Sequence, residues 1–544
     1  MSLLELTFPA LDTTVMSVLS VLLLLAVSWQ LWRLRWTVTR DKECKLPLPK
    51  GSMGWPVVGE TLHWFLQGPD FHISRRQKYG NVFKTHLLGK PVIRVTGAEN
   101  IRKILLGEHK LVCAQWPLSA RIILGPSTLV NSTGDLHRMK RKILAKVFSR
   151  GALEEYIPRL QDMVRCEVAK WCSKGGPVNV YDACRALTFH IAVRVLLGLS
   201  LDDAQITYLS KVFEQLINNL FSLPIDVSFS GLRKGIKARE TIHEFMAKII
   251  EEKLQSQSAE RQNDAFDYIV SSAKQSNHKI TIKELQETAV ELVFAAHSTT
   301  ASACTSLVLQ LLRHPGVVGK ARAELRAVGC LCSGPHCDTA NQEDTRGEEE
   351  EEEKGAAGAG TQSASTEPSS GTGGVGTEEQ PSPAASPRYM NLEKLSRLRY
   401  LDCVIREVLR CLPPVSGGYR TALQTFELDG YQIPKGWSVM YSIRDTHETA
   451  PVYQNSDLFD PDRFGRDRNE ASTGRFNYVP FGGGTRSCIG KELARVILKL
   501  LAVELLSTAE LRLATETFPR MQTVPVVRPV NGLHICFTSA HYTH

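Results

Sequence analysis

A run of twenty uncharged residues, Thr13–Trp32, constrains the fold of this chain more than any other feature. At about 1.5 Å per residue, a helix of this length is about 30 Å long and crosses a bilayer core. Five basic residues follow within the next thirteen positions, whereas only Glu5 and Asp12 carry charge before it. The positive-inside rule therefore places the body in the cytosol. We expect a short lumenal segment at 1–12 and a transmembrane signal anchor at 13–34; the alternative, a cleaved signal peptide, needs positive charge before the apolar run.

The remainder of the chain divides by composition. Residues 35–59 are basic and proline-rich, which is typical of a stiff, non-helical hinge. Residues 60–544 are long and apolar enough to form one large globular domain. Within that domain, residues 330–387 are acidic and of low complexity, and such a composition cannot bury enough apolar surface to fold. We expect a disordered insert there.

Charge and cysteine content limit the partners and the compartment. Residues 338–388 carry a net charge of −9 while the whole chain carries +8, so the rest carries +17. A basic body favours binding to an acidic partner or to an anionic membrane. The chain does not interleave basic and aromatic residues, so we expect that it has no nucleic acid as a partner. The thirteen cysteines lack the spacing of a disulfide framework, which fits a reducing compartment. The cluster Cys330–Cys337 lacks standard zinc spacing.

Helical periodicity dominates the body. Apolar residues recur with a helical period over Thr281–Arg313, after a capping box and before Pro315. A helix of about 30 residues is about 45 Å long and must run through the whole domain. Residues 391–414 predict a further helix, and residues 90–97 a short strand. The expected fold class is therefore mainly α with small β-sheets.

The segment FGGGTRSCIG, Phe481–Gly490, contains one cysteine whose task must be identified. A phosphate-binding P-loop is excluded because Thr485 and Glu492 stand where glycine and a hydroxyl residue are needed. A zinc site is not expected because other cysteine or histidine ligands are missing nearby. An inert buried thiol remains an alternative. A thiolate near a helix N-terminus, flexible glycines and the forked cation of Arg486 together suit a haem with acidic edges.

The spacing F-x-x-G-x-R-x-C-x-G resembles the cysteine loop of cytochromes P450. The resemblance extends from about Leu46 to the C-terminus, apart from the acidic insert. It implies the cytochrome P450 fold, with a long central helix beside haem b (iron protoporphyrin IX) and Cys488 as the axial ligand of the iron. It also implies a set of haem-contacting residues: Phe481, Gly484, Arg486 and Gly490 in the loop, His137 and Arg141 in GDLHRMKRK, and Arg420. In the family a tryptophan is usual where this chain has His137.

Two further motifs match the family. Glu407 and Arg410 form its E-x-x-R pair, and Arg463 of FDPDRF would complete a structural charge network; alone, such a pair is usually a solvated ion pair. In AAHSTT, Thr299 and Ser298 match the positions that hold oxygen and relay protons. A threonine in a helix also commonly bonds back to a carbonyl four residues earlier. Ser298 replaces the usual acid, so the proton path here must use a hydroxyl group and water.

The resemblance implies a monooxygenase that inserts one atom of O2 into a C–H bond, with electrons from NADPH delivered by NADPH–cytochrome P450 reductase. The basic stretch His137–Lys146 suits docking of that acidic flavoprotein, although it is also typical of a solvated helix face. The resemblance to microsomal members of the family further implies the endoplasmic reticulum membrane, with the body in the cytosol.

Closer resemblance suggests the substrate. ETLHWFLQG and the stretch Leu412–Thr449 are similar to the retinoic-acid hydroxylase family, its C-type branch above all. This implies 4-hydroxylation of all-trans-retinoic acid as a clearing reaction, with the 9-cis isomer as a second candidate. Trp116, Phe221 and Phe294 match pocket positions, and Arg121 is a candidate partner for the carboxylate. Two other interpretations stay open: a monooxygenase of a sterol or fatty acid, and a non-catalytic haem sensor or carrier.

Overall fold

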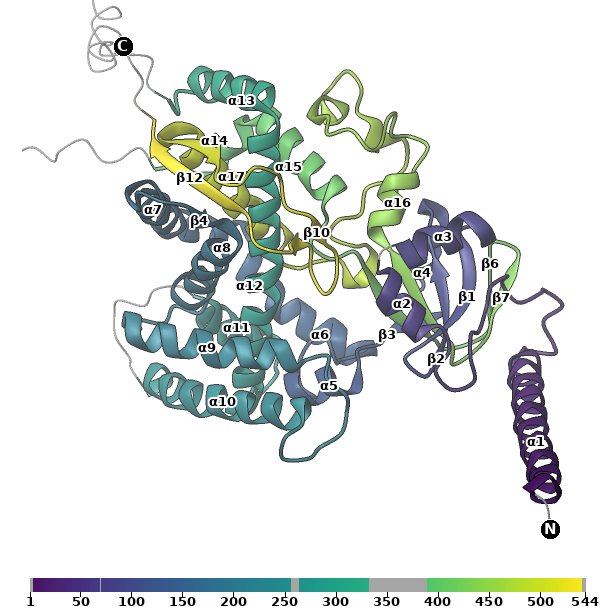
Figure 1. Ribbon diagram of the computed structural model, residues 1–544. Helices are drawn as coiled ribbons and strands as arrows, with labels where there is room; N and C mark the ends of the chain where they lie inside the picture. The colour runs from purple at the N-terminus through teal and green to yellow at the C-terminus, as the bar shows by residue number, and fades with distance from the viewer. Residues whose placement is uncertain (1–2, 69, 256–263, 332–388, 541–544) are drawn as a thin grey trace, which may run out of the picture.

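The computed structural model describes residues 3–68, 70–255, 264–331 and 389–540 (Figure 1). The acidic insert and most of the cluster Cys330–Cys337 lie outside the described residues. All eleven cysteines in the described part are free. The same part contains no group of three His, Cys, Asp or Glu side chains placed to hold a metal ion.

The N-terminal helix α1, Leu3–Val38, projects away from the body (Figure 1). Its residues Val15–Val38 are long and apolar enough to cross a membrane, and only 6% of the span is buried. The helix runs four residues past the end expected at residue 34. The reason is visible in its last turns, where Trp32 and Trp36 are buried against His86 at ring distances of 5.0 and 5.3 Å. The anchor is therefore packed directly against the globular body.

Sixteen further helices form most of the described body, as the sequence predicts. They are α2 Thr61–Gln67, α3 Asp70–Tyr79, α4 Ala98–Leu106, α5 Leu118–Leu124, α6 Gly134–Ala145, α7 Arg150–Ser173, α8 Val180–His190, α9 Asp203–Asn219, α10 Gly231–Gln255, α11 Ala265–Gln275, α12 Ile282–Arg313, α13 Pro315–Ala327, α14 Leu392–Arg397, α15 Arg399–Cys411, α16 Ile443–Thr449 and α17 Lys491–Thr508. Short 3-10 turns include η3 Pro461–Phe464, η4 Glu470–Thr473 and η5 Gly484–Arg486.

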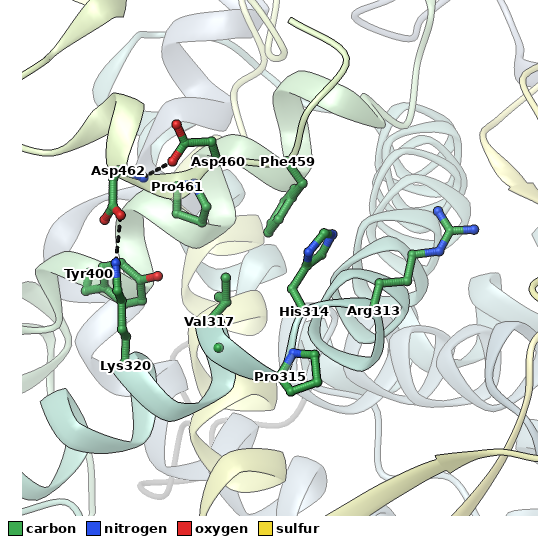
Figure 2. A pocket seen from close by; sticks show the side chains of 11 residues that line it. Arg313, His314, Pro315, Val317, Lys320, Tyr400, Phe459, Asp460, Pro461 and Asp462 are labelled. Atoms are coloured by element: carbon green, nitrogen blue, oxygen red, sulfur yellow. Dashed lines mark hydrogen bonds and ion pairs between the residues drawn. The ribbon is translucent and has the colours of Figure 1, made fainter. Parts of the chain in front are cut away.

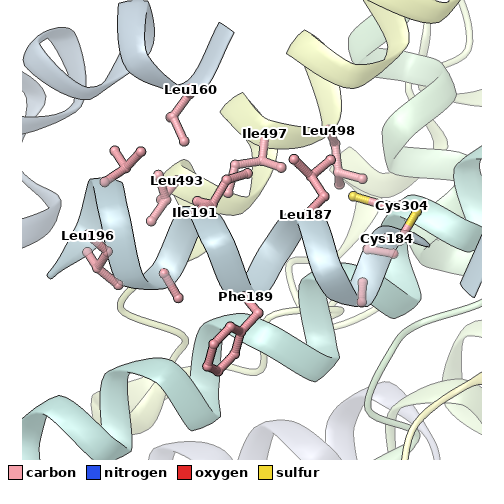
Figure 3. Close-up of a cluster of buried hydrophobic side chains, with 14 of the residues drawn as sticks. Leu160, Cys184, Leu187, Phe189, Ile191, Leu196, Cys304, Leu493, Ile497 and Leu498 are labelled. Atoms are coloured by element: carbon pink, nitrogen blue, oxygen red, sulfur yellow. The ribbon is translucent and has the colours of Figure 1, made fainter. Parts of the chain in front are cut away.

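The long helix α12 runs through the middle of the body (Figure 1). Thr281 and Glu284 form the expected capping box, and the helix ends before Pro315, as predicted. Its composition also passes for a membrane span, but 72% of that span is buried, so it is a core helix. It packs against α8 and α17, and the apolar side chains of these helices meet in one core (Figure 3). The core contains Leu187, Cys304 and Ile497, which are nearly inaccessible to solvent.

The main sheet lies to one side of the helical body, whereas β4, β10 and β12 lie among the helices (Figure 1). The main sheet has the order β1-β2-β8-β5-β3, with only β2 and β8 parallel. Its strands are β1 Val82–Leu87, β2 Lys90–Val95, β8 Ser438–Ser442, β5 Gly417–Ala422 and β3 Val112–Ala114. The smaller sheets are β4 Val178–Asn179 with β12 His534–Ser539 and β9 Ala509–Leu513, β6 Phe426–Leu428 with β7 Tyr431–Ile433, and β10 Met521–Gln522 with β11 Arg528–Pro529. The strand predicted at 90–97 is β2.

The single helix predicted over residues 391–414 is wrong, because the chain breaks it into α14 and α15 at Leu398. Leu398 is fully buried and leaves the helical conformation, with φ −77° and ψ 78°. Immediately after the break, the Glu324 carboxylate accepts the backbone N–H groups of Tyr400 and Leu401 at 2.6 and 2.9 Å. A side chain from α13 thus caps the new helix, and such long-range capping leaves no local sequence pattern.

Candidate active site

The segment Phe481–Gly490 folds back on itself ahead of α17. The Cys488 N–H donates to the Phe481 carbonyl oxygen at 2.8 Å. Gly482 and Gly484 have φ of 67° and 65°, a region that favours glycine. A Cβ atom on Gly484 would lie 2.1 Å from the Leu105 carbonyl oxygen of α4. The glycines therefore let this loop pack backbone-to-backbone against α4.

The Cys488 side chain is exposed along one side of this loop. Although the residue reaches solvent, the protein atoms packed around the thiol partly desolvate it and raise its pKa, while the Gly490 N–H and the charges of Arg141 and Lys491 act in the opposite direction. Metal binding requires the thiolate, and a bound metal drives this deprotonation. The residue is therefore accessible as a ligand and already has cations around it.

Arginines from two other elements reach the cysteine loop. Arg141, on α6, donates to the Ser487 carbonyl oxygen at 2.7 Å. Arg486 donates to the Ser132 carbonyl oxygen and to the Glu108 carboxylate, both at 2.6 Å. Arg420, on β5, lies 2.8 Å from the same Glu108 carboxylate. Arg486 is thus part of the loop, Arg141 binds the loop directly, and Arg420 is linked to it through Glu108.

His137, another predicted haem contact, lies on α6 one helical turn before Arg141 and is buried. Its Nδ1 atom has no hydrogen-bond partner among the described residues, and neither has Nε2 of the adjacent His109. Burial, with a smaller contribution from the charge of Arg486, lowers the pKa of His137 to about 4, so the imidazole is neutral at pH 7. Buried polar atoms normally have partners. These ring nitrogens and the arginines fit the acidic edge of a haem.

On α12, the predicted oxygen-side residues occupy a locally accessible stretch. Ala295 is exposed although the helix around it is buried. Thr299 Oγ1 donates to the Ala295 carbonyl oxygen at 2.6 Å, which is the back-bonded geometry common in helices. Ser298 Oγ lies 3.3 Å from Nδ1 of His297. The Thr299 hydroxyl oxygen keeps its acceptor capacity in this arrangement.

Glu407, Arg410 and Arg463 form one buried network. Glu407 pairs with Arg410 at 2.7 Å and with Arg463 at 3.0 Å, and all three side chains are at most 1% exposed. Arg463 also pairs with Glu470 at 2.7 Å. The network joins α15 to η3 and η4, the segments that lead into the cysteine loop. The charges are therefore structural supports set back from the loop itself.

The predicted pocket residues are only partly brought together. Trp116 and Phe294 meet edge to face with ring centroids 6.1 Å apart. Phe221 follows α9 and is 55% exposed, and the described residues include no ring contact between it and the other two. Arg121, on α5, is also exposed. Trp116 and Phe294 thus form one aromatic pair, and Phe294 directly precedes Ala295.

A pocket of about 450 Å³ lies elsewhere, beside the end of α12 (Figure 2). In it His314 stacks on Phe459 at 4.8 Å, and Lys320 pairs with Asp462 at 2.7 Å. None of its lining residues is a predicted site residue. It is therefore a separate feature of the surface.

Sequence reasoning missed three buried acids near the site. Besides Glu108, the carboxylates of Glu287 and Glu291 on α12 accept backbone N–H groups of the segment 127–130 at 2.7 to 2.8 Å. This segment leads to Ser132, which accepts from Arg486. Two acids four residues apart in the apolar run ETAVELVF were a usable signal, because buried carboxylates require partners. Glu108 stands alone in the stretch LLGEHKL, and no pattern in the sequence around it marks it as a buried acid.

Comparison with known proteins identifies the family. A sequence model described as Cytochrome P450 matches residues 49–330 and 380–537. Cytochrome P450 26C1 of Homo sapiens is 57% identical, over 95% of this chain and 93% of its own length. Cytochrome P450 26B1 of Mus musculus is 53% identical, over 97% and 94%. The solved structure "Retinoic acid bound cyanobacterial CYP120A1" is 31% identical, with a TM-score of 0.75 over 91% of this chain and all of its own. The predicted fold is confirmed, and the chain belongs to the cytochrome P450 family.

Proposed function

We propose that this protein is a membrane-anchored haem-thiolate monooxygenase that hydroxylates all-trans-retinoic acid at C4 and so clears it. The observation that carries the chemistry is the set of cations around Cys488: Arg141 and Arg486 at its loop, and Arg420 linked to Arg486 through Glu108. The substrate rests on two likenesses: to the cytochrome P450 26 relatives, and to the solved structure that holds retinoic acid. The 9-cis isomer is a second candidate substrate.

In this proposal Cys488 ligates the iron of haem b, while Arg141, Arg420, Arg486 and His137 hold its acidic edge. When bound, the haem supplies oxygen activation and oxygen transfer to a C–H bond. The glycines beside Cys488 give a flat ligand the clearance to approach the backbone. Phe481 is proposed as a further contact, because its carbonyl oxygen accepts the Cys488 N–H and so keeps the residue beside the cysteine.

On α12, Thr299 and Ser298 hold protons for the reaction. The Thr299 hydroxyl donates its hydrogen to the Ala295 carbonyl oxygen at 2.6 Å. Its oxygen lone pairs can therefore accept a hydrogen bond from a group on the accessible side of α12. Ser298 takes the position of the usual acid, and its hydroxyl passes protons without carrying a charge. The aromatic pair of Trp116 and Phe294 provides apolar surface for a polyene chain.

Electrons come from NADPH through NADPH–cytochrome P450 reductase. Arg138, Lys142 and Lys146 are exposed on α6 and just after it, and this helix also carries Arg141. A cationic face so close to the cysteine loop suits an acidic flavoprotein. With α1 as a single membrane span and basic residues after it, we place the protein in the endoplasmic reticulum membrane with its catalytic domain in the cytosol.

Turnover tests this function. Full-length protein in vesicles with reductase and NADPH is expected to convert all-trans-retinoic acid to its 4-hydroxy product, identified by chromatography and mass spectrometry. Lauric acid and cholesterol, in parallel reactions, are expected to remain unchanged. Cys488→Ser should lose all turnover. Conversion of the fatty acid or sterol, with retinoic acid untouched, would contradict the proposed substrate.

A further inference from the structure

Glu108 lies in the short connection between α4 and β3, and its side chain is 1% exposed. Its Oε1 atom accepts the Ala114 N–H at 2.9 Å and Arg486 Nε at 2.6 Å. Its Oε2 atom lies 2.8 Å from Arg420 Nε as an ion pair, without the orientation of a hydrogen bond. One buried carboxylate thus contacts two arginines that lie more than 300 positions later in the sequence.

We propose that Glu108 is a positioning residue for the haem: its carboxylate holds Arg420 and Arg486 in place and sets the positive charge offered to the haem propionates. This inference rests on the proposed haem-thiolate function.

Mutual repulsion explains why such a residue is needed. Two guanidinium groups that meet in a buried place repel each other, and the repulsion is strong where water is excluded. A shared carboxylate compensates both charges and fixes the direction of each forked side chain. The hydrogen bond from Ala114 ties that carboxylate to β3, where Ala114 pairs with Arg420 of β5. Glu108 is therefore anchored to the strand beside the arginine it contacts.

Glu108 also lowers the positive charge that its arginines present. Arg141, Arg420 and Arg486 carry three positive charges, and Glu108 carries one negative charge, which leaves two. This net positive charge suits the two ionised propionate groups of haem b. His137 adds no charge because its imidazole is neutral at pH 7. Without Glu108, one positive charge would remain in excess beside the haem and would favour the reduced iron, which holds one more electron.

The test is the reduction potential of the purified full-length haem protein, with haem retention measured alongside. Glu108→Gln keeps the shape and can still accept from Ala114, so it is expected to fold, to shift the potential to a more positive value and to lose haem faster. Glu108→Asp keeps the charge but is too short to span both arginines. It should keep a potential close to wild type while it also loses haem faster.

Two control variants separate this role from a general effect of charge or stability. Glu427→Gln removes an exposed acid paired with Lys103, and Glu60→Gln removes a buried acid paired with Arg75 in another part of the fold. Both should leave the potential unchanged. The proposal is overturned if Glu108→Gln also leaves it unchanged, or if Glu108→Asp shifts it equally. If wild-type protein binds no haem, the proposed function itself is wrong.

Discussion

Gly484 lies against the carbonyl oxygen of Leu105, in the loop that carries Cys488. Any Cβ there would be 2.1 Å from this backbone oxygen, and the residue also has a positive φ of 65°. We expect Gly484→Ala to lower the free energy of unfolding by about 4 kcal/mol, through strain and overpacking together, and to reduce haem incorporation. Thermal unfolding and the haem-to-protein absorbance ratio measure both effects.

Gly482 offers a matched control in the same loop. Its φ is 67°, but a Cβ atom there would meet nothing within 4 Å. Gly482→Ala therefore carries the conformational strain alone, about 1 kcal/mol. Equal losses in the two alanine variants would contradict the claim that close packing against α4 makes Gly484 necessary.

Glu291 should make stability depend on pH. Burial raises the pKa of this carboxyl to about 7, although two backbone N–H groups and Lys140 oppose the shift. Between pH 4.5 and 7 the unfolded chain releases this proton while the folded protein keeps it, so the contribution to the free energy of unfolding falls as pH rises. The loss over this range is about 3 kcal/mol.

Glu291→Gln removes the titration and provides the comparison. Denaturant unfolding of both proteins at several pH values should show that wild type loses stability relative to the variant from pH 4.5 to 7. A constant difference over that range would mean that Glu291 has an ordinary pKa in the folded protein.

At the scale of elements, the network of Glu407 joins α15 to η3 and η4. Its carboxylate faces Arg410 and Arg463, and none of these side chains is more than 1% exposed. Glu407→Ala leaves two buried cations without their shared acid. We expect a loss of about 3–5 kcal/mol in the free energy of unfolding, which thermal unfolding measures. The yield of folded protein on purification should also fall.

An exposed ion pair provides a control for the loss of stability expected in Glu407→Ala. Glu393 and Arg397 pair on the surface of α14 with more than 60% of each side chain exposed, and Glu393→Ala should cost less than about 0.5 kcal/mol. If both alanine variants unfolded at the same temperature, the buried network would not support the loop as described.

For the whole molecule, sequence patterns predicted what depends on local spacing. The anchor, the long helix α12 and the cysteine loop follow from apolar runs, helical periods and a ten-residue motif. Glu108 could not be found this way, because its two arginines lie more than 300 positions away along the chain. The break at Leu398 depends similarly on Glu324, a residue of another helix. Phe221 matched a pocket position, yet its exposed place is set by the turn after α9.

The central claim is that a haem bound at Cys488 lies within reach of retinoic acid. An absorbance titration of purified full-length protein tests it most directly. The reduced protein with carbon monoxide should show the absorption band of a thiolate-ligated haem. All-trans-retinoic acid should then shift the Soret band of the oxidised protein in a saturable way, while cholesterol should not. A missing thiolate band would contradict the ligand assignment, and an unmoved Soret band would contradict retinoic acid as the substrate.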